Sequence, residues 1–296
     1  MKWVDGPELN VPYYTFEQID QTGLVKCAYT TRVYRENGKL TDLYQPRLTA
    51  GSDPEKVAYC TQLLADQFGA DRDHVVHSVQ KHTANIHQIT EADLGAEENR
   101  PSLMAVDGLI TDRPGVMLQS FGADCPSVYL LDPVHKAIGL CHSGRKGTQF
   151  HIAGKMLAEM ERAFGTRPED VLAAISPGIC CDCYEVGDDV AEEFVQDYAE
   201  HGHGAGKVDA LPENDMQKRE LIIAAAKKLG GIAEIRRGRY HLDLNRAIAG
   251  SLEQRGVPAS QIEMSDLCTR CRSDIFYSFR GQGCIINENC GALMLL

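Results

Sequence analysis

The sequence predicts an α/β protein (also describable as α+β) built on mixed β-sheets. Short apolar segments typical of strands alternate along the 296 residues with longer segments in which apolar residues recur every three or four positions. Four strand-like segments follow one another between residues 106 and 141, and connections such as RPG (113–115) and DPVH (132–135) are too short for crossover helices. This region is therefore expected to be antiparallel or mixed, which disfavours a purely doubly wound sheet. Because no linker interrupts the pattern, we expect a single domain over residues 1–296.

The strand predictions depend on short length, apolar composition and boundaries at Gly, Pro or Asp. The segment 127–132 (SVYLLD) shows all three features, since it follows Pro126 and ends at Asp132, which is followed by a second proline, Pro133. In chain order the predicted strands are 25–32, 74–80, 106–112, 116–121, 127–132, 136–141, 171–176 and 290–296.

The helix predictions depend on the spacing of apolar residues. In chain order the predicted helices are 54–68, 147–164, 188–199, 215–229 and 243–255. Helix 215–229 has the pattern of an amphipathic helix that faces a core, and this packing role explains it fully. The segment 201–215 (HGHGAGKVDALPEND) is the most loop-like interior stretch, and we expect it to be a surface excursion within the domain.

The composition limits the classes of partner. With 43% hydrophobic residues the chain can bury a sizeable core, and its net charge of −12 argues against an extended nucleic-acid surface, which needs clustered lysines and arginines. A local anion pocket remains compatible with this charge. The N-terminal stretch lacks the apolar run of a signal peptide, and no segment approaches the roughly 20 apolar residues of a membrane span. We therefore expect a cytoplasmic protein that binds neither nucleic acid nor a membrane.

Reactive side chains cluster at the ends of the predicted strands. Asp124 and Cys125 occupy a turn after strand 116–121, His142 ends strand 136–141, and His82 lies just beyond strand 74–80. Two imidazoles and a thiolate are ligands that Zn²⁺ accepts, and three protein ligands leave the open position of a catalytic site. His142 also precedes a small basic loop that opens a helix, where backbone N–H groups can face an anion.

Other interpretations of these residues stay open. Cys125 could be a small buried core residue, or the nucleophile of a metal-free cysteine hydrolase with His142 as its base. Asp124 could cap its turn rather than move protons.

The 11 cysteines are an odd number without a secretory signal, which favours reduced thiols and metal ligands over a disulfide framework. Two CxxC pairs, Cys180 with Cys183 and Cys268 with Cys271, have the ligand spacing of a structural zinc site. The alternative is that these four cysteines are buried or surface thiols that bind no metal.

Several phrases together resemble one known family. They are SVQKH (78–82), VDGLITDRPGVMLQSFGADCPSVYLLDP (106–133), IGLCHSGRKGT (138–148), CYEVGDDVAEEF (183–194), DLNRAIAGSLEQRGV (243–257) and CTRCRSDIFYSFR (268–280). The chain is similar, from about residue 25 to its end, to the laccase-domain or multicopper polyphenol oxidase family, whose members are also described as purine nucleoside phosphorylases.

The resemblance implies a metal site and an activity. The family's two histidines and one cysteine match His82, Cys125 and His142. The implied activity is zinc-dependent phosphorolysis of adenosine, inosine or methylthioadenosine, with deamination of adenosine. The implied fold has α/β/β/α layers like those of toxin deamidases that use a Cys and a His.

The resemblance also suggests roles for residues around the metal site. Asp124 would serve as a proton shuttle or support for the ligands, and Lys146, Arg32 and Arg280 would contact phosphate. The partners are then a purine nucleoside and phosphate.

The sequence departs from the family pattern near this site. The usual HxGWRG motif reads HSGRKG, so that Arg145 replaces an aromatic residue and Lys146 replaces an arginine, and Asp182 stands where the family has a cysteine. Of the four CxxC cysteines, the family pattern expects only Cys183 and Cys268. These departures leave open a catalytically weak protein with an interaction or regulatory role.

A copper-dependent polyphenol oxidase is a further alternative, because copper is possible at the same ligands. It is disfavoured, since a laccase needs many paired histidine motifs and this chain has a single one, His201-Gly202-His203.

Overall fold

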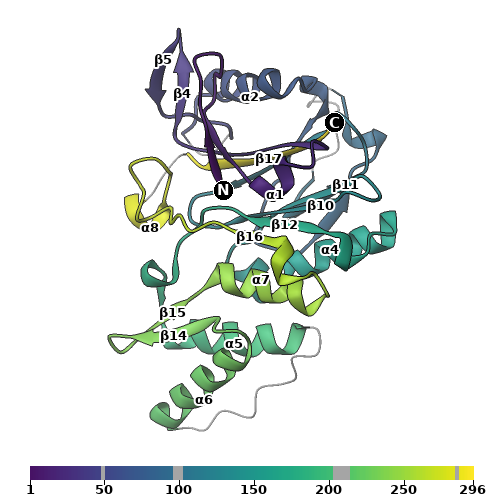
Figure 1. The fold of residues 1–296 in the computed structure, drawn as a ribbon. Coiled ribbons are helices and arrows are strands. Elements are labelled where there is room, and N and C mark those ends of the chain that lie inside the picture. Colours follow the sequence, from purple (N-terminus) through teal and green to yellow (C-terminus); the bar gives the residue numbers. More distant parts are fainter. Residues whose placement is uncertain (48–50, 96–102, 203–213, 284–286) are drawn as a thin grey trace.

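The computed structural model describes residues 1–47, 51–95, 103–202, 214–283 and 287–296. Within these residues, two six-stranded mixed sheets pack face to face with helices on both outer faces, which gives α/β/β/α layers (Figure 1). The expected fold class is therefore confirmed. None of the helices in the described ranges combines the length and apolarity that crossing a bilayer requires.

The first sheet brings the two ends of the chain together. Its strands, in spatial order, are β1 (Lys2–Val4), β2 (Tyr13–Thr15), β3 (Val25–Thr30), β17 (Asn289–Leu295), β9 (Met117–Gly122) and β6 (Val75–Val76). Among the strand pairs that the described residues form in this sheet, β6–β9 alone is parallel. Helix α2 (Pro54–Phe68) covers the outer face, where Leu64 and Phe68 pack with Phe121. A glycine in the left-handed conformation, Gly69, ends this helix.

The second sheet consists of strands from residues 86–175 and one strand, β16, from near the end of the chain. Its strands, in spatial order, are β16 (Ile262–Met264), β12 (Leu172–Ile175), β10 (Ser127–Asp132), β11 (Ala137–His142), β8 (Gly108–Thr111) and β7 (Ile86–Gln88). Helices α4 (Ile152–Phe164) and α7 (Leu244–Gln254) cover its outer face, with Met156 and Leu252 in the same cluster as Val128. Between the two sheets, Leu118 and Leu293 pack with Tyr129 and Leu140.

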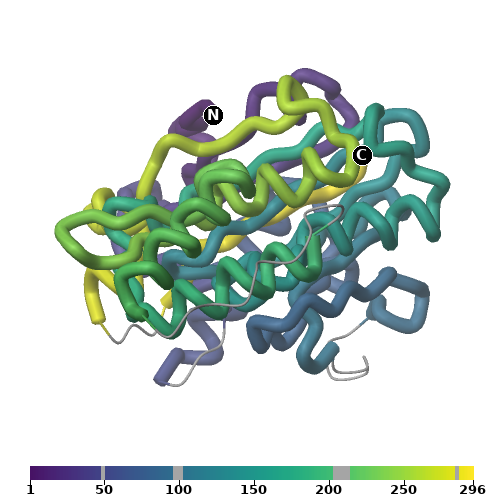
Figure 2. The backbone as a smooth tube through the Cα atoms, turned by 90° about the horizontal axis from the view of Figure 1, so that it is seen from below, coloured from purple at the N-terminus to yellow at the C-terminus, as the bar shows by residue number. Residues whose placement is uncertain are grey.

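A smaller lobe packs below the second sheet (Figure 1). Its elements are β13 (Glu185–Val186), β14 (Ala233–Arg236), β15 (Arg239–Leu242), α5 (Asp188–His201) and α6 (Asp215–Lys228). They share a core that includes Phe194, Tyr198 and Tyr240. Figure 2 views the molecule from this side and also shows the chain start beside β16, where the Met1 ammonium lies 2.6 Å from Glu263.

Two predictions about the elements need correction. Strand β9 does not continue the antiparallel run into β10; it lies in the other sheet, because the turn after Gly122, with Asp124 at φ +94°, carries the chain from one sheet to the other. The single helix expected over 147–164 is divided into α3 (Arg145–Gln149) and α4, because His151 adopts a left-handed conformation with φ +57°.

The sequence did not predict several short strands. These are the hairpin of β4 (Val33–Glu36) and β5 (Lys39–Asp42), together with β1, β2, β7 and β13 to β16. The expected excursion 201–215 falls largely on residues 203–213, which lie outside the described residues, as does His203 of the HxH motif.

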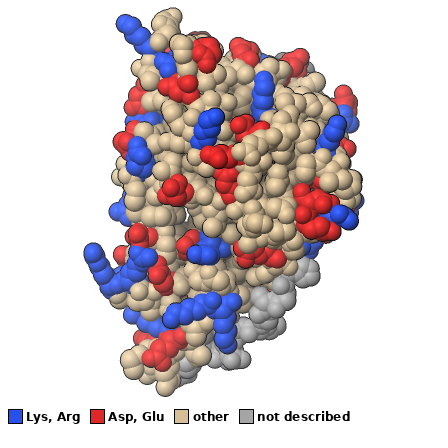
Figure 3. All heavy atoms as spheres, viewed as in Figure 1, with Lys and Arg blue, Asp and Glu red and all other residues tan. Residues whose placement is uncertain are grey.

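Charged side chains of both signs intermingle over the main body on the face in Figure 3, and basic groups gather toward the smaller lobe. Over the whole sequence, 42 acidic residues outnumber 30 basic ones.

Candidate metal centre

Three side chains from separate segments converge where the two sheets meet. His82 follows β6, Cys125 occupies the turn between β9 and β10, and His142 ends β11. Their possible ligand atoms all lie within 4.8 Å of one another, and Cys125 Sγ is 3.9 Å from His82 Nε2. His142 is buried, Cys125 is half-buried and His82 is exposed, so the cluster opens to solvent on the His82 side.

A buried carboxylate that sequence reasoning missed fixes both histidines. Asp107 Oδ1 accepts hydrogen bonds from His142 Nδ1 at 2.9 Å and from the His82 backbone N–H at 3.0 Å. Its Oδ2 accepts from the Lys81 N–H and from the N–H and hydroxyl of Thr83. Because Nδ1 of His142 carries the shared proton, its Nε2 is left to act as a ligand. The available signal was an aspartate directly before Gly108 at the start of an apolar strand.

The electrostatics of Asp107 follow from these contacts. Burial alone would raise its pKa, but hydrogen bonds from His142 and Thr83 outweigh burial and hold the pKa well below its usual range. Asp107 is therefore ionised at neutral pH and supplies a fixed negative charge beside the His142 ring.

Gly144 explains the glycine of the HSG motif. A Cβ atom at this position would lie 2.6 Å from His82 Cδ2, 3.0 Å from Cys125 Sγ and 3.3 Å from His142 Cε1. Any larger residue would displace the three converging side chains. The backbone of Gly144 thus forms the wall against which they are placed.

Without an ion, Cys125 and His142 form a charged pair. Burial raises the pKa of the Cys125 thiol, but His142 and His82 outweigh burial and lower it to about 7. Burial lowers the pKa of His142, yet Cys125 and Asp107 outweigh this effect and raise it to about 9. The thiolate, which is the form that binds a metal, is therefore accessible at neutral pH.

Asp124 is tied into the turn before Cys125. Its Oδ1 accepts from the Thr269 hydroxyl at 2.6 Å and its Oδ2 accepts from the Arg280 backbone N–H at 2.7 Å. The Ile179 N–H also donates to the Asp124 carbonyl at 2.8 Å. These contacts indicate that Asp124 holds the turn with Cys125 in place.

The three predicted phosphate contacts occupy different environments. Arg32 donates to both carboxylate oxygens of Asp42 at 2.7 Å, so its charge is already paired there. Lys146 is exposed on α3, two residues beyond Gly144. Arg280 lines a pocket of about 330 Å³.

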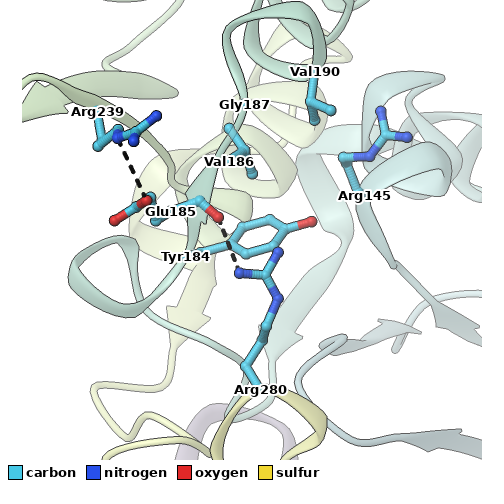
Figure 4. A pocket seen from close by; sticks show the side chains of 8 residues that line it. All are labelled: Arg145, Tyr184, Glu185, Val186, Gly187, Val190, Arg239 and Arg280. Atoms are coloured by element: carbon cyan, nitrogen blue, oxygen red, sulfur yellow. Dashed lines mark hydrogen bonds and ion pairs between the residues drawn. The ribbon is translucent and has the colours of Figure 1, made fainter. Parts of the chain in front are cut away.

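The residues that line this pocket are drawn in Figure 4, and two of them connect it to the segments that carry the converging side chains. Arg145, which lines it, directly follows Gly144, and the Arg280 backbone binds Asp124. The Arg280 guanidinium lies 5.0 Å from the ring centroid of Tyr184 and donates to the Glu185 carbonyl at 3.0 Å. Sequence reasoning did not single out Tyr184, although its CYEV phrase was part of the resemblance.

The residues present fit a bound metal ion. Two imidazoles and a thiolate can donate to one ion, Gly144 leaves no room for another side chain among them, and Asp107 orients the His142 ring. Together with the layered fold, this defines a class: α/β/β/α proteins with a His₂Cys cluster that could hold a metal ion, near an arginine-lined pocket.

The comparisons with known proteins name the family. A family model described as multi-copper polyphenol oxidoreductase laccase matches residues 27–295, and the chain belongs to this family. The resemblance found in the sequence is thereby confirmed.

Curated relatives carry the names of purine nucleoside enzymes. A purine nucleoside phosphorylase of Bacteroides thetaiotaomicron is 32% identical over 79% of this chain and 78% of its own. Adenosine deaminase RL5, of an unknown prokaryotic organism, is 32% identical over 79% of each chain.

Solved structures show the same fold. Bacillus licheniformis hypothetical protein YfiH has a TM-score of 0.77 at 27% identity and covers 99% of both chains. YlmD from Geobacillus stearothermophilus has a TM-score of 0.73 at 27% identity and covers 92% of both chains.

Proposed function

We propose that this chain is a zinc-dependent purine nucleoside phosphorylase that acts on adenosine, inosine and methylthioadenosine, and that it deaminates adenosine at the same site. The observation that carries the proposal is the convergence of His82, Cys125 and His142 beside a pocket that offers cations and an aromatic ring. The names of the curated relatives support an enzyme of purine nucleosides.

His82, Cys125 and His142 would hold the ion. When bound, zinc supplies Lewis acidity at its open coordination position. Asp107 keeps the His142 proton on Nδ1, and Gly144 keeps the ligands together. The exposed side of His82 gives substrate a way in.

The pocket residues would bind and orient the reactants. The Arg280 guanidinium favours phosphate, with Arg145, which also lies 3.6 Å from the Glu193 carboxylate, as a second cation. The Tyr184 ring offers a face on which a purine stacks. In phosphorolysis, a phosphate oxygen bonds to the anomeric carbon of the ribose while the bond to the purine nitrogen breaks. The purine leaves with the electron pair and takes up a proton. In deamination, water adds to the amino-bearing carbon of adenine and ammonia leaves.

Enzyme of measured metal content, incubated with each nucleoside with and without phosphate, tests the proposal. We expect phosphate-dependent release of free purine, formation of ribose 1-phosphate from adenosine or inosine, and conversion of adenosine to inosine. His142→Ala should lower these rates by at least about 100-fold, because a ligand is lost. Release of purine at the same rate in wild type and His142→Ala would refute the proposal.

A metal-free cysteine hydrolase is the second candidate, because the charged pair of Cys125 and His142 is also the arrangement of a thiol nucleophile with its base. Metal analysis separates the two. The hydrolase would keep full activity after chelation, whereas the zinc enzyme would lose activity and regain it when zinc is returned. The reduced thiols that both candidates require agree with the cytoplasmic location expected from the sequence.

A further inference from the structure

Four cysteines that the proposed reaction does not use meet near the pocket. Cys180 and Cys183 lie in a tight turn, and Cys268 and Cys271 lie in a second turn after β16, 88 residues farther along the chain. Their sulfur atoms all lie within 4.8 Å of one another, and those of Cys183 and Cys271 are 3.4 Å apart. The two CxxC pairs, far apart in sequence, thus form one four-sulfur cluster.

The spacing of the sulfurs fits one metal ion. Four thiolates placed tetrahedrally about 2.3 Å from a zinc ion are roughly 3.8 Å from one another. The observed separations, up to 4.8 Å, need only small side-chain movements to reach this arrangement. An iron–sulfur cluster would spread the cysteines farther, because several irons and sulfides lie between them. A disulfide would need a sulfur separation of about 2.05 Å.

The backbone around the sulfurs is arranged to stabilise negative charge. Cys268 Sγ accepts hydrogen bonds from the N–H groups of Cys180 at 3.2 Å and Cys271 at 3.4 Å. Such N–H to sulfur bonds hold thiolate ligands in position. Arg270 adds a positive charge between the two cysteines of its turn and donates to the Cys183 carbonyl at 3.1 Å. Cys268 is buried, whereas Cys271 is exposed and leaves a path for an ion to enter.

A neighbouring thiol shows that the convergence is selective. Cys181 belongs to the same turn as Cys180 and Cys183, but its thiol donates to Glu234 Oε1 at 3.0 Å. It is therefore not one of the clustered sulfurs and serves as a matched control.

The cluster lies between two parts of the candidate active site. Thr269, between Cys268 and Cys271, donates to Asp124 in the turn that holds Cys125. On the other side, Cys183 is followed directly by Tyr184 of the pocket. An ion that joins the two turns would fix both the catalytic turn and the wall of the pocket.

We propose that Cys180, Cys183, Cys268 and Cys271 bind a second zinc ion, which is structural and closes the pocket side of the active site. All four positions are filled by protein thiolates, so this ion has no place for substrate. Its role is to hold two turns together.

Zinc content per chain, measured by plasma mass spectrometry on protein purified under reducing conditions, tests this proposal. The double substitution Cys268→Ser and Cys271→Ser should remove one zinc per chain, and Cys181→Ser should remove none. His82→Ala with His142→Ala should remove the other zinc and leave the four-cysteine ion. If the proposed function fails because the first centre binds no zinc, the wild type should still hold one ion that the double serine variant loses.

Cobalt substitution of the wild type provides a measurement that does not depend on a folded variant. A four-thiolate site gives strong thiolate-to-cobalt charge-transfer absorption, several times that of the single Cys125 thiolate, and most of it should remain in His82→Ala with His142→Ala. Equal zinc in the wild type and the double serine variant, or a cobalt spectrum without this absorption, would overturn the proposal. So would a Cys183–Cys271 disulfide found by mass spectrometry of the unreduced, freshly purified protein.

Discussion

Asp107→Asn tests how the histidines of the candidate metal centre are held. Asp107 accepts five hydrogen bonds, two at Oδ1 and three at Oδ2. An asparagine has one oxygen and one NH₂ group in these two places, so it can accept only the bonds on one side. If the oxygen stays on His142 and His82, the amide nitrogen faces three donors from Lys81 and Thr83. The Thr83 hydroxyl can still donate to the Ala105 carbonyl, which leaves two N–H groups without a partner. At about 1–3 kcal/mol for each of them, we expect a loss of roughly 2–6 kcal/mol in the free energy of unfolding. The weaker hold on His142 should lower zinc affinity about 10- to 100-fold.

Chelator competition measures the zinc affinity, and urea denaturation measures the stability. Asp132→Asn is the matched control, because Asp132 is also a buried carboxylate that accepts from a histidine, His135, but lies at the opposite end of β10 from Cys125. It should lose comparable stability and keep its zinc affinity. Wild-type zinc affinity in Asp107→Asn, or equal loss of affinity in both variants, would refute the positioning role of Asp107.

Three further predictions follow from other contacts. Gly144→Ala should lose most of the zinc held by His82, Cys125 and His142, which lowers the zinc content of purified protein by about one ion per chain, because the added methyl group would lie 2.6 Å from His82; an unchanged zinc content would contradict this. Arg280→Ala should raise the KM for phosphate about 10-fold or more, whereas Arg32→Ala should leave it unchanged, since Arg32 is paired with Asp42. Burial lowers the pKa of His151 to about 4, below its unfolded value near 6.5, so unfolding takes up a proton in this window and stability falls as pH drops through it. The loss should reach roughly 3 kcal/mol in pH-dependent denaturation and be absent in His151→Asn, and identical pH profiles would contradict it.

The central strands and the long helices could be predicted because local patterns encode them. Strands β10 and β11 are buried along their whole length and have polar residues only at their ends, as expected for strands covered on both faces. Helix α2 has an aspartate cap, a proline in its first turn and a final glycine. The crossing of β9 to the other sheet depends on pairing with β17, more than 160 residues away, which no local pattern reveals. The break at His151 likewise depends on a tertiary contact, because its ring stacks on Tyr198 and donates to the Tyr198 carbonyl.

The sequence predicted only some of the residues of the candidate site. Ligand chemistry drew attention to His82, Cys125 and His142, but with 10 histidines and 11 cysteines the choice among many sets came from the resemblance. Asp107 could not be recognised, because an aspartate before a glycine also describes an ordinary turn. The pairing of Arg32 with Asp42 depends on the β4–β5 hairpin, which brings the two residues together.

Anomalous X-ray scattering at the zinc edge, from crystals of the wild-type protein, tests the metal centre most directly. We expect a peak about 2.3 Å from Cys125 Sγ and about 2.1 Å from one ring nitrogen each of His82 and His142. A crystal grown with zinc in which Cys125 and His142 contact each other, with no peak among the three side chains, would contradict it.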